Sequence, residues 1–279
     1  MKLFRLVGYF FLVLILLFFG IQFFLGFFGL VSSDENISLE KNATIGIIDE
    51  TPKQESKSIS IKPESKSNKQ EIVVEKEIEL GQPIFREFNW DYGDSVWYLD
   101  LQFYPGLYQI YKERSRERDF DLFASDNYDD QIIKDIVTTI KDAAEKNGIS
   151  NDEVPYLVTS FVQSLTYTSD KVTTGYDEYP RFPYETLYDN GGDCEDTSIL
   201  VASLLQEMGY GVVLIKLPDH MAVGVKCDSD MPGYSYSYEG DRYCYLETTA
   251  KGWPIGEMPP EYENLKAQIE PIYKKPYLE

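Results

Sequence analysis

Residues 6–31 form an almost unbroken apolar run without a charged side chain, softened only by Tyr9 and Gln22. As a helix, this run would be about 39 Å long, which exceeds the roughly 30 Å apolar thickness of a bilayer. A cleaved signal peptide has a shorter apolar region of about 7–15 residues and a following site of small residues. No such site follows cleanly here, so the run predicts an uncleaved transmembrane anchor over residues 1–31.

The charges that flank this run predict its orientation in the membrane. Two basic residues precede the run and three acidic residues follow it: Lys2 and Arg5, then Asp34, Glu35 and Glu40. The positive-inside rule therefore places the N-terminus in the cytoplasm and the rest of this single-pass protein outside it. Glycosylation acceptor sequences that begin at Asn36 and Asn42 agree with an external face, but their occupancy stays open.

Residues 32–82 have the composition of a disordered extracytoplasmic linker. Lys, Glu, Ser and Ile dominate, and no aromatic residue occurs between Val31 and Phe85. Such a segment cannot bury enough apolar surface to order itself. We expect a flexible tether, with a strand only at its end, over residues 72–78.

Aromatic residues become dense from Phe85 onward, so residues 83–279 are predicted to be the folded domain. Alternating large side chains predict a hairpin over residues 88–101 that turns at 93–95. Apolar spacing predicts helices over residues 104–117, 126–146, about 152–165 and 194–208. A loop is expected over residues 168–192, and strands over residues 211–217, 220–227 and 243–249. This order predicts an α+β fold with helices packed on an antiparallel sheet.

Cys194 and His220 are the residues around which a reactive site is expected. His220 is the only histidine, and Cys194 opens a predicted helix behind two glycines. The helix climbs about 22 Å and the following strand returns about 23 Å, so the chain regains the level of Cys194 at His220. A helix N-terminus and an imidazole both lower the pKa of a thiol. Glu247, on the next strand, is the candidate that orients the imidazole.

These motifs resemble the transglutaminase-like superfamily, which has a papain-like core with the order Cys, His, Asp. The resemblance covers roughly residues 85–260 and rests on residues 161–167, 179–187, 191–196, 220 and 245–249. It implies acyl transfer at an amide, in which Cys194 attacks, His220 shuttles the proton and Glu247 orients His220. It also implies that Gln163 is an oxyanion-hole donor together with the backbone N–H of Cys194. The sequence departs from the family by carrying Glu247 where Asp is usual.

The acids beside the nucleophile, Glu195 and Asp196, lie in the first helical turn. There they are expected to stabilise the helix, with substrate binding as the alternative. Papain-type proteases proper fit less well, because their His follows the Cys by about 130–150 residues. Here His220 follows Cys194 by 26 positions (220 − 194).

Cys227 and Cys244 lie on the two strands that carry His220 and Glu247. An external location permits a disulfide between them, which would leave Cys194 free. Direct pairing of His220 with Glu247 would put residue 240 opposite Cys227, so a bridge requires a bulge or an offset pairing. The disulfide therefore stays open at this point.

Composition excludes several function classes. A net charge of −21 argues against nucleic acid, and a single histidine makes a zinc site improbable. No phosphate loop or dinucleotide fingerprint occurs, and the acids at Asp126, Asp129 and Asp130 fit a solvated helix start better than a calcium site. No cofactor and no metal are expected.

The expected function is that of a membrane-anchored, extracytoplasmic, cysteine-dependent amide hydrolase or acyl-transfer enzyme that acts on a protein or peptide. Hydrolysis is favoured over cross-linking, because no amine site can be read from the sequence. The alternative is a non-catalytic surface module that binds a protein partner through its many tyrosines, of which the chain has 22. The substrate and the oligomeric state stay open.

Overall fold

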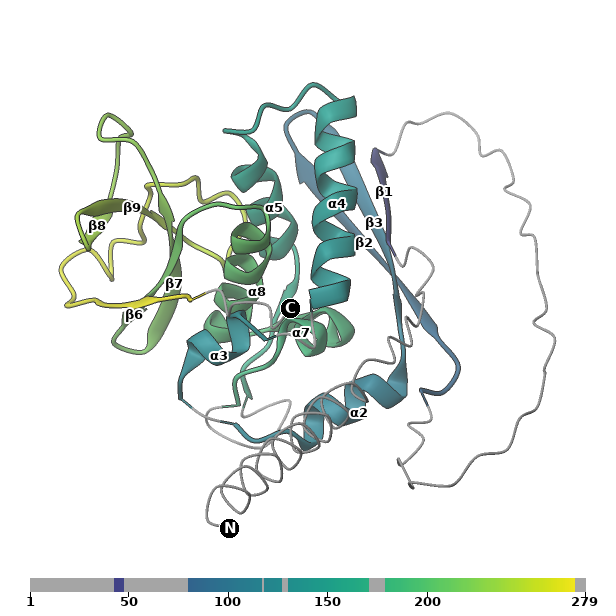
Figure 1. Ribbon diagram of the computed structural model, residues 1–279. Coiled ribbons are helices and arrows are strands. Elements are labelled where there is room, and N and C mark those ends of the chain that lie inside the picture. Colours follow the sequence, from purple (N-terminus) through teal and green to yellow (C-terminus); the bar gives the residue numbers. More distant parts are fainter. Residues whose placement is uncertain (1–42, 48–79, 117, 127–129, 171–178, 274–279) are drawn as a thin grey trace, which may run out of the picture. The chain divides into compact units, whose positions relative to one another are not determined.

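The computed structural model describes residues 43–47, 80–116, 118–126, 130–170 and 179–273 (Figure 1). The predicted membrane helix over residues 6–31, the acceptor residues Asn36 and Asn42, and the predicted strand over residues 72–78 lie outside these ranges. Within the described ranges, none of the helices combines the length and the apolar character that a membrane crossing needs.

Helices lie between two antiparallel sheets (Figure 1). The first sheet has the order β1-β3-β2, from Ala43–Ile47, Ser95–Phe103 and Ile84–Tyr92. The second has the order β10-β6-β7-β9-β8, from Gln268–Pro271, Val212–Leu217, His220–Lys226, Asp241–Leu246 and Ser235–Tyr238. Helices α4 (Asp130–Lys146), α5 (Val154–Gln163) and α8 (Cys194–Glu207) fill the space between them. The chain therefore has the expected mixture of helices and antiparallel strands.

The first sheet contains the predicted hairpin. Strands β2 and β3 pair along their whole length, and Tyr92 pairs with Ser95 across a two-residue turn. On β3, every second side chain faces the core, as the two-residue period of a strand requires. The buried residues of β3 are Trp97, Leu99, Leu101 and Phe103.

Strand β1 lies within residues 32–82, for which the sequence predicts an unstructured linker. It pairs with β3 from Ala43 opposite Leu101 to Ile47 opposite Trp97, and the compact unit begins at Lys41. The prediction is therefore wrong for these five residues. An edge strand this short is held by its backbone pairing with β3, and the side chain of Ile45 packs against the core. Gly46 leaves room for the ring of Tyr98, which a Cβ would meet at 2.5 Å.

Most of the remaining short elements were not predicted from the sequence pattern. Helix α2 (Pro105–Glu113) agrees with the predicted helix, but α7 (Pro183–Asp189) lies in the segment expected to be a loop, and α3 (Phe120–Ala124) lies where no element was predicted. Both are too short to show a helical period. Prolines favour the start of α7, because Pro183 lies in its first turn, where no intrahelical N–H bond is lost. The two-residue strands β4 (Thr166–Tyr167) and β5 (Gly191–Gly192) pair in parallel.

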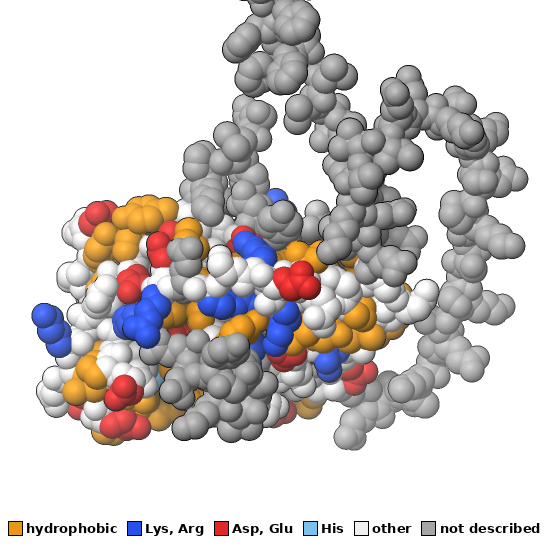
Figure 2. All heavy atoms as spheres, turned by 90° about the horizontal axis from the view of Figure 1, so that it is seen from below, with side chains coloured by type: hydrophobic (Ala, Val, Ile, Leu, Met, Phe, Trp, Pro, Cys, Tyr) orange, Lys and Arg blue, Asp and Glu red, His pale blue; other side chains and the backbone are white. Residues whose placement is uncertain are grey.

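Helix α8 forms the centre of the core. It packs against β6 and β7 of the five-stranded sheet and against α3, α4, α5 and α7. Its residues from Thr197 to Leu205 are all buried, so the helix carries apolar and small polar side chains on every face. On the face of the molecule shown in Figure 2, basic, acidic and apolar side chains are interspersed rather than gathered into one patch.

Candidate active site

Cys194 is the first residue of α8, immediately after β5 and Asp193. The backbone N–H of Asp193 donates to the carboxylate of Asp196 at 3.2 Å, which is the reciprocal half of a capping box. Gly192 permits this close approach, because a Cβ there would lie 2.5 Å from Asp196. The local sequence therefore fixes the cysteine at the helix N-terminus, as expected.

His220 and Glu247 form a buried pair. His220 opens β7 after a tight turn from β6, and its Nε2 lies 3.0 Å from Oε2 of Glu247. The Tyr245 hydroxyl donates to the same oxygen at 2.8 Å. The other oxygen accepts from the backbone N–H groups of Thr248 and Thr249 and from the Thr249 hydroxyl. Burial alone would raise the pKa of Glu247, but His220 and Thr249 hold it at about 2.

The register of β7 and β9 determines how Glu247 reaches His220. The strands pair from Lys226 opposite Tyr243 to Val223 opposite Leu246. Continued toward the site, this register places residue 249, not 247, opposite His220. Glu247 is therefore diagonal to the histidine, and a longer side chain spans the greater distance. The direct pairing of residues 220 and 247 considered from the sequence is wrong by two positions.

The hydrogen bonds also fix the tautomer of a neutral His220. An ionised carboxylate can only accept, so Nε2 carries the hydrogen that is donated to Glu247. Nδ1 is then an unprotonated acceptor on the other side of the ring. A base with this orientation suits proton abstraction from a nucleophile.

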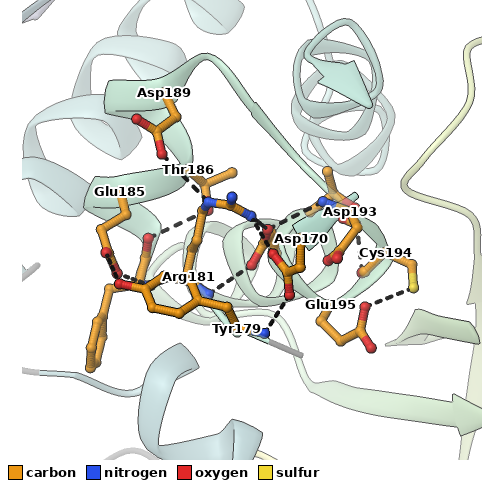
Figure 3. Close-up of polar contacts among 12 residues, drawn as sticks. Asp170, Tyr179, Arg181, Glu185, Thr186, Asp189, Asp193, Cys194 and Glu195 are labelled. Atoms are coloured by element: carbon orange, nitrogen blue, oxygen red, sulfur yellow. Dashed lines mark hydrogen bonds and ion pairs between the residues drawn. The ribbon is translucent and has the colours of Figure 1, made fainter. Parts of the chain in front are cut away.

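The sulfur of Cys194 lies at the start of β7, beside Met221, which follows His220 in the chain. The backbone N–H of Met221 donates to its sulfur. Among the described residues, however, no hydrogen bond joins Cys194 to His220, and the thiol instead donates to Oε2 of Glu195 at 2.9 Å (Figure 3). Burial and the Glu195 charge raise the pKa of Cys194, against the opposing effect of Met221. The lowered thiol pKa expected from the sequence is therefore not found in this structure.

Gln163 has a different position from that expected of an oxyanion-hole donor. Its buried side-chain Nε2 donates to the backbone carbonyls of Glu247 at 2.8 Å and of Trp253 at 3.2 Å. Both amide hydrogens are thereby used. The side chain supports the backbone at Glu247 and has no hydrogen left for an oxyanion.

Two tyrosines near the thiol were not singled out by sequence reasoning. The ring of Tyr262 stacks on the His220 imidazole, with centroids 4.2 Å apart and an interplanar angle of 2°. Tyr167, on β4, is 57% exposed and interacts electrostatically with Cys194. No sequence signal marks Tyr262, since it lies in a segment without strand or helix pattern.

Arg181 is the centre of a buried ionic cluster behind the site (Figure 3). Its guanidinium binds Asp196, Asp170 at 3.0 Å and Asp189 at 3.4 Å, and its backbone N–H donates to Asp196 at 2.7 Å. Burial raises the pKa of Asp196 to about 7 despite the opposing charge of Arg181. Burial, followed by the charge of Asp196, raises the pKa of Asp193 to about 9. One cation thus lies among several acids.

Among the described residues, one group of acids has the mutual spacing of a metal site. The carboxylate oxygens of Asp170, Asp193 and Asp196 lie within 4.8 Å of one another. In this structure the positive charge among them comes from the Arg181 guanidinium, so we assign the group to an internal ion-pair cluster. The acid considered earlier as a loose calcium ligand, Asp126, forms two hydrogen bonds with an arginine.

Cys227 and Cys244 form a disulfide, with Cα atoms 5.8 Å apart. In the β7–β9 register, Cys244 pairs with Val225, and the N–H of Cys227 donates to the carbonyl of Arg242. The bridge therefore joins diagonal neighbours, without a bulge. Cys194 is the free cysteine.

Comparison with known proteins gives distant structural neighbours. No protein-family model matches the sequence, and no curated protein matches it significantly. Solved structures of Legionella pneumophila LapG match with a TM-score of 0.33, 16% identity and coverage of 58% of this chain and 79% of that one. Its EGTA-treated and calcium-bound forms match with TM-scores of 0.33 and 0.32 and 17% identity, covering 58% and 57% of this chain and 77% and 78% of theirs. TM-scores of this size do not establish a common fold.

Proposed function

We propose that the folded domain is a cysteine-dependent enzyme of the transglutaminase-like type that hydrolyses an amide bond in a peptide or protein. The observation that carries this proposal is the buried His220–Glu247 pair at 3.0 Å, together with a free cysteine at a helix N-terminus whose sulfur accepts from the N–H of Met221, the residue after His220. A histidine held by an ionised acid, with Nδ1 left as an acceptor, is the arrangement that acyl transfer by a thiol needs.

The reaction divides into two acyl transfers. His220 Nδ1 accepts the thiol proton while the sulfur of Cys194 attacks the amide carbon, and the backbone N–H of Cys194 stabilises the oxyanion. The C–N bond breaks as His220 returns the proton to the leaving amine, which leaves a thioester. His220 then takes a proton from water, whose oxygen attacks the thioester. The C–S bond breaks, the carboxylic acid leaves, and the thiol is restored.

The location of the domain is also part of the proposal. The apolar run over residues 6–31 supports a single-pass anchor with the N-terminus in the cytoplasm. The Cys227–Cys244 disulfide supports a domain outside the cytoplasm, because disulfides persist in oxidising compartments.

A second candidate is a non-catalytic protein-binding module. The observation that favours it is the Cys194 thiol, which is buried and bonded to Glu195 rather than to His220. A binding module requires no activated thiol, whereas an enzyme must release this thiol during turnover. The two candidates therefore differ in whether Cys194 reacts.

Hydrolysis of a mixture of internally quenched peptides by the full-length chain tests the proposal. We expect activity in the wild type, loss of activity in Cys194→Ala, and a reduction of about 10²–10⁴-fold in His220→Ala. Glu207→Gln, at the far end of α8, is the control and should keep the wild-type rate. Hydrolysis that persists in Cys194→Ala would overturn the thiol mechanism, and a wild type that cleaves nothing in the mixture argues for the binding module.

A further inference from the structure

The contact between Cys194 and Glu195 is not explained by the proposed reaction. The thiol donates to Oε2 of Glu195 at 2.9 Å, although these residues are neighbours in one helical turn (Figure 3). A carboxylate at this position accepts the hydrogen that His220 must accept for catalysis. Its negative charge also disfavours a thiolate beside it.

Among the described groups around the thiol, the Met221 N–H opposes this charge and the neighbouring acids add to it. On its own helix end Cys194 interacts with Asp193 and Glu195, both acids, and both raise its pKa. Tyr167, on β4, and Tyr262, which stacks on His220, also lie close enough to Cys194 to interact with it electrostatically. Neither tyrosine carries a positive charge. The N–H of Met221 reaches the sulfur, and Met221 directly follows His220 in the chain. His220 is therefore a nearby group that could carry a positive charge.

Glu195 also borders a second environment. Its side chain lines a small pocket whose wall includes Arg116, Arg118 and Tyr179. Asp170 also lines this pocket, and Arg116 pairs with Glu185 at 2.7 Å. A carboxylate that rotates away from the thiol would therefore meet basic side chains, which favour its charge.

We propose that Glu195 restrains the nucleophile: its carboxylate holds the Cys194 hydrogen in the resting enzyme, and it must rotate toward the arginine-lined pocket before His220 can take that hydrogen. This inference rests on the proposed function, because it assumes that Cys194 must react. Glu195 is a positioning residue in this scheme, since it acts on the substrate only through the thiol. Peptide binding over Cys194 supplies the event that displaces the carboxylate.

The pH dependence of iodoacetamide alkylation of Cys194 tests the restraint in the full-length chain. Alkylation consumes the thiolate, so its rate reports the thiolate fraction. Glu195→Gln keeps the size of the side chain and removes its charge. We expect faster labelling than in the wild type at pH 7, by about tenfold for each unit by which the apparent thiol pKa falls. Equal rates and equal apparent pKa values in both proteins would overturn the restraint.

Two further variants keep the test decisive. Glu195→Ala removes the acceptor altogether and should reproduce the gain, so a folding defect in one variant does not decide the result. Glu207→Gln removes one acid from the other end of α8 and should label like the wild type. A gain of the same size in Glu207→Gln would mean that net charge, not the contact, controls the thiol, which overturns the proposal.

His220→Ala separates this inference from the proposed function. A Glu195→Gln gain that disappears in the double variant with His220→Ala supports both the restraint and the Cys–His pair. A gain that persists in the double variant supports the restraint and counts against the pair. No gain from Glu195→Gln, while His220→Ala still slows labelling, overturns the restraint and leaves the pair intact.

Discussion

Glu247 reaches His220 diagonally across β9 and β7, and its carboxylate is fixed at five points. The two oxygens accept from His220, Tyr245, Thr248 and, twice, Thr249. A carboxylate with this many donors is pre-organised, so its direction does not depend on the histidine alone. The pair is therefore a rigid element of the fold as well as a candidate part of the reaction.

Glu247→Gln is expected to lower stability in a pH-dependent way. The folded-state pKa of about 2 lies below the ordinary value of 4.5, so Glu247 stabilises the fold above pH 4.5. This contribution, on the order of 3 kcal/mol, is lost as the pH falls toward 2. Urea unfolding at pH 7, 4 and 2.5 should show a smaller pH dependence in the variant. An unchanged dependence would mean that other carboxylates dominate acid unfolding.

For Asp193→Asn we expect a change in stability with the opposite dependence on pH. The pKa of Asp193 is raised to about 9, so the folded state holds a proton that the unfolded state releases. Its contribution is complete at low pH and is lost as the pH rises from about 4 toward 9. Asn caps a helix as well as Asp does, so the substitution removes mainly the titratable carboxyl group. Unfolding at pH 6 and 9 should show a gain that is larger at pH 9, and a loss at both pH values would contradict this.

Arg181→Met is expected to destabilise the domain strongly. It leaves the buried carboxylates of Asp170 and Asp196 without their cation, which typically costs about 3–5 kcal/mol. The double variant with Asp196→Asn should recover part of this loss. The exposed Lys226–Asp241 pair is the control, because Lys226→Ala should leave the free energy of unfolding nearly unchanged. Equal effects of Arg181→Met and Lys226→Ala would show that the cluster contributes little.

The lengths of the helix and the strand expected from the sequence predicted the backbone arrangement around the site. A helix that starts at Cys194 and a strand that returns to His220 were expected from element lengths, and the structure has both. Alternation on the strand before Glu247 also points to Tyr245, since residues two apart share a face. These features depend on local periodicity, which a sequence displays directly.

The contacts within the site depend on information that the sequence lacks. The Cys194–Glu195 bond and the use of Gln163 by two carbonyls follow from side-chain rotamers and from where the chain passes later. Strand pairing registers also come from tertiary packing, so the two-residue offset between β7 and β9 was missed. A lone arginine in the aromatic stretch around Arg181 was the one available signal for a buried ion pair. Strand β1 was not predicted, because five residues contribute little to the average composition of a long segment.

Removal of the Cys227–Cys244 disulfide is expected to destabilise the domain while leaving Cys194 in place. The bridge closes a loop with a sequence separation of 17, for which chain entropy predicts a loss of about 3 kcal/mol. Denatured protein should show one free thiol without reductant and three with it, because Cys194 is the free cysteine. The double variant Cys227→Ala, Cys244→Ala should unfold at a lower denaturant concentration. Val223→Ala, on strand β7, serves as a control for the loss of side-chain packing. Three free thiols without reductant would show that the bridge does not form, and would remove the structural support for an oxidising compartment.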